Sequence, residues 1–168
     1  MITQILKLLR VLASEDSPMQ ISMGVALAMV MGLTPLFSLH NLLVVIVLLS
    51  FRINLAAFLL AWAFFSGLAY LLDPLFHSLG LSILQHAAMQ DIWTEMYNST
   101  YWRLANFNNT IVMGSFVTAM LAFIPMLLIL NFLIRRYRSH VLVFLKKSKL
   151  VTWMQSSKMI TRITSAME

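Results

Sequence analysis

Long uncharged apolar stretches separated by short polar breaks dominate the chain. Residues 18–51, 55–72 and 111–134 contain no Lys, Arg, Asp or Glu. A helix needs about 20 mainly apolar residues to cross the roughly 30 Å hydrocarbon core of a bilayer. The pattern therefore predicts an all-α integral membrane protein with two long transmembrane helices, over 54–73 and 111–134.

The first apolar stretch, residues 18–51, is interrupted once, at a predicted hairpin turn formed by Gly32, Thr34 and Pro35. Gly and Pro so close together end one helix and start another. The Ser17-Pro18 pair is a typical N-cap and first helical position. Each half is about 16 residues, or about 24 Å of helix, which is short for a crossing. We therefore favour a re-entrant or broken hairpin over two tight crossings.

The segments around these spans have interfacial character. Residues 1–17 mix charged and apolar positions, which is typical of an amphipathic helix lying on the membrane. Residues 74–110, with Asp73 as the expected N-cap, carry regularly spaced Trp and Tyr and predict a periplasmic-side interfacial segment. Residues 135–168 form a basic amphipathic tail. We expect one membrane domain over residues 1–168.

Composition and charge add the orientation. The chain is 60% hydrophobic and 11% charged, with a net charge of +6. Positive residues mark the cytoplasmic side, so both termini are expected there and the number of crossings is even. We predict a multi-pass protein of a bacterial inner (cytoplasmic) membrane. The basic residues expected at its surface, where they would meet lipid head groups rather than nucleic acid, are Arg135, Arg136, Arg138, Lys146, Lys147 and Lys149.

Small residues recur every four positions on two of the predicted helices. Such ridges let helix backbones approach closely in lipid, where hydrophobic burial does not drive association. We interpret them as packing within one chain, with a contact between identical chains as the alternative. The predicted packing residues are Gly24, Ala28 and Gly32 in the first ridge and Gly114, Thr118 and Ala122 in the second.

Four polar residues are candidates for binding a ligand or a lipid. His40 and Asn41 follow the hairpin turn inside the apolar region, where a polar group needs a partner. The alternative is that they cap the second half-helix or form hydrogen bonds across the hairpin turn. Arg52 and Asn54 lie between two spans, and a guanidinium matches the geometry of a phosphate. The alternative for Arg52 is that it only fixes orientation.

Catalytic chemistry is poorly represented. The chain has no Cys, and it has no phosphate-binding glycine loop, G-x-S-x-G or H-E-x-x-H motif. Asp73 and His77 lie one helical turn apart, but a metal needs more ligands than these two. We therefore expect no catalytic residues, no metal and no cofactor, and we predict that the protein is not an enzyme.

The order of these motifs resembles a known family. Ser17-Pro18, Gly24, the Gly32–Pro35 turn, His40-Asn41 and Arg52-Ile-Asn54 are similar to a bacterial membrane family catalogued as domain of unknown function two-zero-six-two. The run from Asp73 to Gly80 resembles its gammaproteobacterial conserved hypothetical branch. Family members often carry an Asn-Pro pair that is absent from residues 63–67, so its role does not transfer. The resemblance implies an inner-membrane protein and no particular activity.

These features favour a non-enzymatic inner-membrane component in envelope lipid transport or lipid handling. Its expected partners are membrane lipids and either a larger membrane-anchored or periplasmic protein or further copies of itself. A homo-oligomeric channel or small-solute transporter is the first alternative. The second is a structural or assembly factor of a membrane complex.

Overall fold

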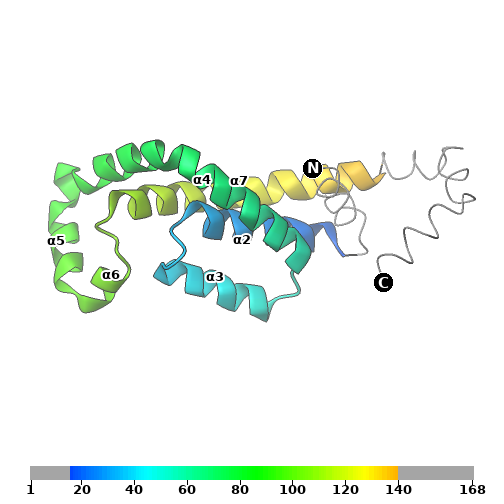
Figure 1. The fold of residues 1–168 in the computed structure, drawn as a ribbon, viewed down its shortest axis with the longest axis horizontal. Helices are drawn as coiled ribbons and strands as arrows, with labels where there is room; N and C mark the ends of the chain where they lie inside the picture. Colours follow the sequence, from blue (N-terminus) through cyan, green and yellow to red (C-terminus); the bar gives the residue numbers. More distant parts are fainter. Residues whose placement is uncertain (1–15, 140–168) are drawn as a thin grey trace, which may run out of the picture. The chain divides into compact units, whose positions relative to one another are not determined.

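A computed structural model describes residues 16–139, and these residues are helical, with no β-strand among them. In chain order the elements are α2 (Pro18–Leu33), α3 (Leu39–Ser50), α4 (Leu55–Leu84), the 3-10 turn η1 (Ala87–Met89), α5 (Gln90–Asn98), α6 (Thr100–Leu104) and α7 (Thr110–Tyr137) (Figure 1). The predicted all-α class is confirmed. The predicted N-terminal helix, apart from its last two residues, and the tail beyond residue 139 lie outside the described residues.

The predicted broken hairpin is present as α2 and α3. Ser17 caps α2: its Oγ accepts a hydrogen bond from the backbone N–H of Gln20 at 3.2 Å, and the Gln20 side chain accepts one from the N–H of Ser17 at 2.7 Å. Pro18 occupies the first turn, as expected. The helix ends at Leu33, and the chain resumes helical structure only at Leu39. The break thus lies at the Gly-Pro signal.

Helix α4 is longer than the sequence pattern predicts. We expected Asp73 to cap a new segment beginning at Pro74, but α4 runs without interruption from Leu55 to Leu84. Pro74 removes one backbone N–H and places its ring against the preceding turn, which disfavours a helix interior. Packing opposes this local preference, because Phe76 and Gly80 beyond the proline are both buried. The predicted N-cap role of Asp73 is therefore wrong.

Residues 85–109 reverse the chain from α4 to α7 through η1, α5 and α6. The indole Nε1 of Trp93 on α5 donates to the carbonyl of Ile83 at 3.2 Å, and its ring lies 6.1 Å from that of Phe107. Asn106 adopts a φ of 53° in the link to α7, a backbone region that Asn tolerates better than most residues. The segment is therefore bound to the end of α4 by Trp93, and the contact of Trp93 with Phe107 joins its two halves.

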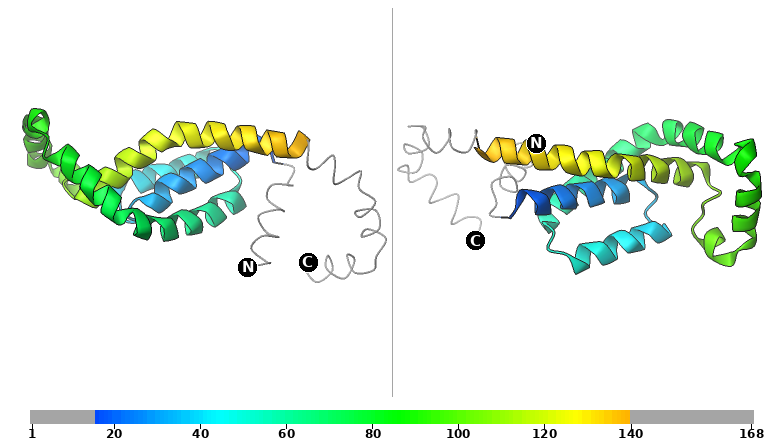
Figure 2. Two further views of the ribbon diagram at one scale, coloured as in Figure 1. Left: turned by 90° about the horizontal axis from the view of Figure 1, so that it is seen from above. Right: turned by 180° about the vertical axis from the view of Figure 1, so that it is seen from behind.

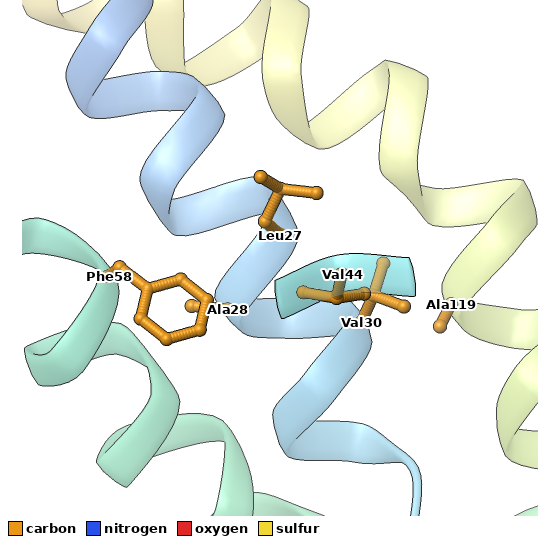
Figure 3. Packing of buried hydrophobic residues seen from close by; sticks show 6 residues of the cluster. All are labelled: Leu27, Ala28, Val30, Val44, Phe58 and Ala119. Carbon is orange, nitrogen blue, oxygen red and sulfur yellow. The ribbon is translucent and has the colours of Figure 1, made fainter. Parts of the chain in front are cut away.

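Helix α2 forms the centre of the unit that contains residues 16–131. Figure 2 shows it between α4 and the first part of α7. One core cluster joins Leu27, Ala28 and Val30 of α2 to residues of the three neighbouring helices (Figure 3). Those residues are Val44 of α3, Phe58 of α4 and Ala119 of α7. Helix α2 is thus enclosed, with ten buried residues, whereas α3 buries only two.

Two helices, α4 and α7, are long and apolar enough to cross a membrane, as their sequences predict. Only 17% of the most apolar 18-residue stretch of each helix is buried inside the chain. Large side chains also point outward along α3, among them Leu39, Leu42, Leu43, Ile46 and Leu49. An apolar surface of this extent needs a lipid or protein environment. The fold therefore fits membrane association.

Candidate functional site

Asn41 closes the hairpin turn from within. Its side chain is 3% exposed, and its Nδ2 donates to the carbonyls of Pro35 at 3.0 Å and Leu36 at 3.2 Å. The single hydroxyl proton of Thr34 is shared between two acceptors, the Asn41 Oδ1 at 3.1 Å and the Val30 carbonyl at 2.8 Å. A chain break in an apolar environment leaves carbonyls that only protein groups can satisfy. Asn41 supplies that need, so its polarity is explained by the turn.

His40, the neighbour of Asn41, lies on a different side of α3 and has another environment. Its ring centroid is 5.0 Å from that of Phe116 on α7. Its Nε2 is buried and has no hydrogen-bond partner among residues 16–139. Buried polar atoms are nearly always paired, so each exception needs an explanation. The two neighbouring residues therefore have different roles. The amide of Asn41 stabilises the turn, whereas the imidazole of His40 has an unsatisfied nitrogen.

His40 lines an apolar cavity of about 480 Å³ between α3, the start of α7 and the α5–α6 segment. Its volume falls within the range of about 300–1,000 Å³ that is usual for ligand sites. Sequence reasoning identified only His40 among the lining residues as a binding candidate and assigned Trp93 and Trp102 to a surface belt. The other lining residues are Leu39, Leu43, Met96, Ala105, Phe107, Val112, Met113, Phe116 and Val117. Such side chains have no local pattern that marks them as one site.

Asn54 and Arg52 do not form a joint site. Asn54 caps α4, because its Oδ1 accepts from the Ala57 N–H at 2.6 Å, while its Nδ2 donates to the carboxylate of Asp16. Its backbone N–H also donates to the carbonyl of Gln20 on α2 at 3.3 Å. Arg52 is exposed at the mouth of a smaller hollow of about 250 Å³. Only Arg52 is therefore positioned to meet an external group.

This division predicts different outcomes for the two substitutions. We expect Asn54→Ala to lower the free energy of unfolding by about 1–2 kcal/mol, because an N-cap and a link to Asp16 are lost together. Arg52→Gln should change it by less than about 0.5 kcal/mol, as is usual for exposed positions. Thermal unfolding of the purified variants in the same detergent measures both. Equal losses would contradict the assignment.

The first predicted packing ridge lies against α4. A Cβ atom added to Gly24 would come within 2.8 Å of the Asn54 carbonyl oxygen, and one added to Gly32 within 2.7 Å of the Phe65 Cβ. Ala28 between them is fully buried. Gly24 thus faces the start of α4, and Gly32 faces a position further along that helix. Helices α2 and α4 therefore run in the same direction.

The second ridge contains a still closer approach. A Cβ on Gly114 would lie 1.9 Å from the carbonyl oxygen of Phe76, and one on Gly80 would lie 1.9 Å from that of Thr110. Thr118 Oγ1 donates to the Gly114 carbonyl at 2.7 Å. Ala122 packs against a second core cluster, which consists of Met29, Leu33, Phe65 and Phe76. Helices α4 and α7 thus cross backbone to backbone at two glycines. Sequence reasoning missed Gly80, because no second small residue repeats with it at four-residue spacing.

The remaining candidates are placed as follows. Arg135 and Arg136 lie in the last turn of α7, and Arg138 directly follows that helix. His77 Nδ1 lies 2.7 Å from Thr110 Oγ1, which ties α4 to the start of α7. Within residues 16–139 no three His, Asp or Glu residues gather as metal ligands would. Lys146, Lys147 and Lys149 lie outside the described residues.

Comparison with known sequences places the chain in a family. Residues 5–142 match the family described as "Uncharacterized protein conserved in bacteria (DUF2062)". The chain belongs to this family. An uncharacterized protein of Treponema pallidum (strain Nichols) is similar to it, with 27% identity over 141 residues that make up 84% of this chain and 87% of the relative. No solved structure matches the chain.

The DUF2062 match extends well beyond the motifs on which the resemblance rests. It includes the hairpin, α4, the α5–α6 segment and α7, and so contains every residue that lines the 480 Å³ cavity. The description of the family names no activity. The function therefore has to be argued from the cavity and its surroundings.

Proposed function

We propose that this DUF2062 protein is a non-enzymatic, multi-pass component of a bacterial inner membrane that holds a lipid chain during envelope lipid handling. The observation that carries the proposal is the 480 Å³ cavity, whose lining is apolar apart from His40 and contains two Trp and two Phe residues. The lining resembles the interior of a bilayer more than it resembles an enzyme's active site.

The energetics of burial favour an acyl chain as the occupant. Each methylene group removed from water contributes about 0.8 kcal/mol. In the plane of a membrane this gain is smaller, because a lipid chain is already in an apolar medium, and so the shape of the cavity must select the occupant. Aromatic rings from α5, α6 and α7 provide rigid walls, which hold a chain with little loss of side-chain freedom.

The position of the cavity supports the same interpretation. Its α5–α6 wall belongs to the segment that the charge pattern assigns to the periplasmic interface. Tyr97 and Tyr101 on that segment are exposed, as interfacial aromatic residues are. A chain entering beside them would leave the outer leaflet with its head group near water. His40 offers one polar atom inside, suited to a hydroxyl or an ester oxygen.

We infer a partner protein as the second part of the proposal. Residues 16–139 contain no nucleotide-binding or hydrolytic motif, so movement of a held lipid would depend on another component. A larger membrane-anchored or periplasmic protein would fit this need. Extraction in a mild detergent should retain such a protein together with lipid, and a preparation that retains neither would contradict the proposal. Solute flux into liposomes that contain the chain alone would instead favour a channel.

Filling the cavity tests the lipid part directly. We expect Val117→Trp to weaken binding of a phospholipid about tenfold, because the indole ring occupies space that the acyl chain would fill and overpacking of a site costs about 1–3 kcal/mol. Leu121→Trp is the matched control, since it lies one turn further along α7 and is 73% exposed. Titration of the delipidated protein with one phospholipid, followed by native mass spectrometry, gives both affinities. Binding unchanged by Val117→Trp would overturn the cavity as the lipid site.

A further inference from the structure

A second cavity, of about 470 Å³, lies on another side of the hairpin turn. It is bounded by the end of α2 and the turn, by α4, and by the start of α7. Its lining is more polar than that of the first cavity, with Thr34, Ser66, Tyr70, Asp73 and Asn109 among the residues. The two cavities thus differ in their lining, which is almost wholly apolar in the first and includes several polar groups in the second.

Among the described residues that line it, Asp73 is the only carboxylate, and none is Lys, Arg or His. The carboxylate is partly buried and makes no hydrogen bond or ion pair with the described residues. It also has no capping role, because α4 continues through Pro74. A partly buried charge without a counterion is unfavourable. Asp73 therefore presents an uncompensated negative charge to the cavity.

An aromatic residue completes the chemistry. Tyr70 lines the same cavity and lies one turn before Asp73 on α4, whereas Trp62 lies three turns away, about 16 Å along the helix. The negative face of an aromatic ring attracts a cation, and aromatic walls are how proteins recognise ammonium groups. A metal ion would instead need several oxygen ligands close together. One carboxylate beside one aromatic side chain suits an organic ammonium better than a metal.

The height of Asp73 along α4 indicates where the ammonium group comes from. Residues 55–72 are uncharged and extend for about 27 Å as a helix, close to the roughly 30 Å of a hydrocarbon core. With the start of α4 at one surface of the membrane, Asp73 lies at the level of the head groups on the opposite side. A lipid head group reaches this depth without leaving its leaflet.

We propose that the Asp73 cavity binds the ammonium group of a phospholipid head group, which makes the protein selective for aminophospholipids. This inference rests on the proposed lipid-handling function and names the class of lipid. The carboxylate of Asp73 pairs with the ammonium, and the ring of Tyr70, one turn before it on α4, contacts its C–H and N–H groups. The phosphate and the acyl chains remain toward the membrane.

The test compares phosphatidylethanolamine with phosphatidylglycerol of identical acyl chains, titrated into the delipidated full-length protein and followed by native mass spectrometry. The wild-type protein should bind phosphatidylethanolamine at least about fivefold more tightly, the size expected for a partly desolvated cation–π and ion-pair site. Asp73→Asn, which keeps the shape of the side chain, should abolish this preference. Asp91→Asn, at an exposed aspartate of α5 outside both cavities, should leave it intact. Tyr70→Leu, at an exposed position, should reduce it.

The outcomes separate this inference from the proposed function. Tight binding of both lipids without preference, or a preference that survives Asp73→Asn, overturns the aminophospholipid site and leaves lipid binding in place. Binding of neither lipid overturns both proposals. Ethylammonium chloride, added as a competitor at millimolar concentration, distinguishes the source of the amine. Its failure to displace phosphatidylethanolamine supports the lipid, whereas full displacement assigns the cavity to a free amine.

Discussion

Replacing Gly80 or Gly114 with alanine is expected to destabilise the protein by about 3 kcal/mol or more, although alanine is the better helix former. The added methyl group would lie 1.9 Å from a backbone carbonyl oxygen of the facing helix. Backbone atoms cannot rotate away as a side chain can, so α4 and α7 would have to separate. Separation would also loosen the packing of Phe76, which is 3% exposed in the core.

Gly67 provides the matched control, since it lies on α4 and has no atom within 4 Å of an added Cβ. We expect Gly67→Ala to be neutral or to stabilise the protein by up to about 1 kcal/mol, the difference in helix propensity between the two residues. Thermal unfolding of the variants in one detergent measures the sign and size of each effect. Destabilisation of equal size at Gly67 and Gly114 would contradict the close helix crossing.

Replacing Asn41 with alanine has the second largest expected effect, a loss of about 2–3 kcal/mol in the free energy of unfolding. The substitution leaves the carbonyl of Leu36 without its donor, removes one of the two acceptors of Thr34 Oγ1 and leaves a gap where a buried side chain was. An unsatisfied buried polar group costs about 1–3 kcal/mol. The hairpin turn should therefore loosen, and proteolysis at the turn should become faster.

Ser38→Ala is the control for Asn41→Ala. Ser38 Oγ donates to the carbonyl of Pro35 at 2.6 Å, but that carbonyl also accepts from Asn41. Its removal leaves no carbonyl unpaired, so we expect a loss below about 1 kcal/mol. Thermal unfolding and limited proteolysis compare the two variants. If Ser38→Ala proved as damaging as Asn41→Ala, the turn would depend on its local geometry and not on the buried amide.

The sequence predicted the elements of this fold well because their signals are local. Uncharged length identified α4 and α7, and the Gly-Pro break identified the hairpin of α2 and α3. Ser17 and Pro18 begin α2 because capping depends on residues only three positions apart. The same local logic was wrong at Asp73-Pro74. There the buried Phe76 and Gly80 hold the helix together past the proline.

The candidate sites were harder to predict, because they combine residues that are distant in sequence. His40 and Asn41 are adjacent, yet one lines a cavity and the other satisfies a turn. Asn54 was grouped with Arg52 as a ligand contact but caps α4 and contacts Asp16. Neither distinction follows from residue type or spacing. The direction of a side chain depends on which helix packs against it.

The sequence alone thus determined that the chain is an all-helical protein with two long apolar helices and a broken pair of short ones. These features follow from hydropathy, capping and the restrictions on Gly and Pro, all of which act over a few residues. Only the tertiary structure decided that α2 is enclosed by α3, α4 and α7, that Gly80 meets Gly114, and that Asp73 and His40 line different cavities. Those outcomes depend on contacts between helices, for which the spacing of residues along one helix carries too little information.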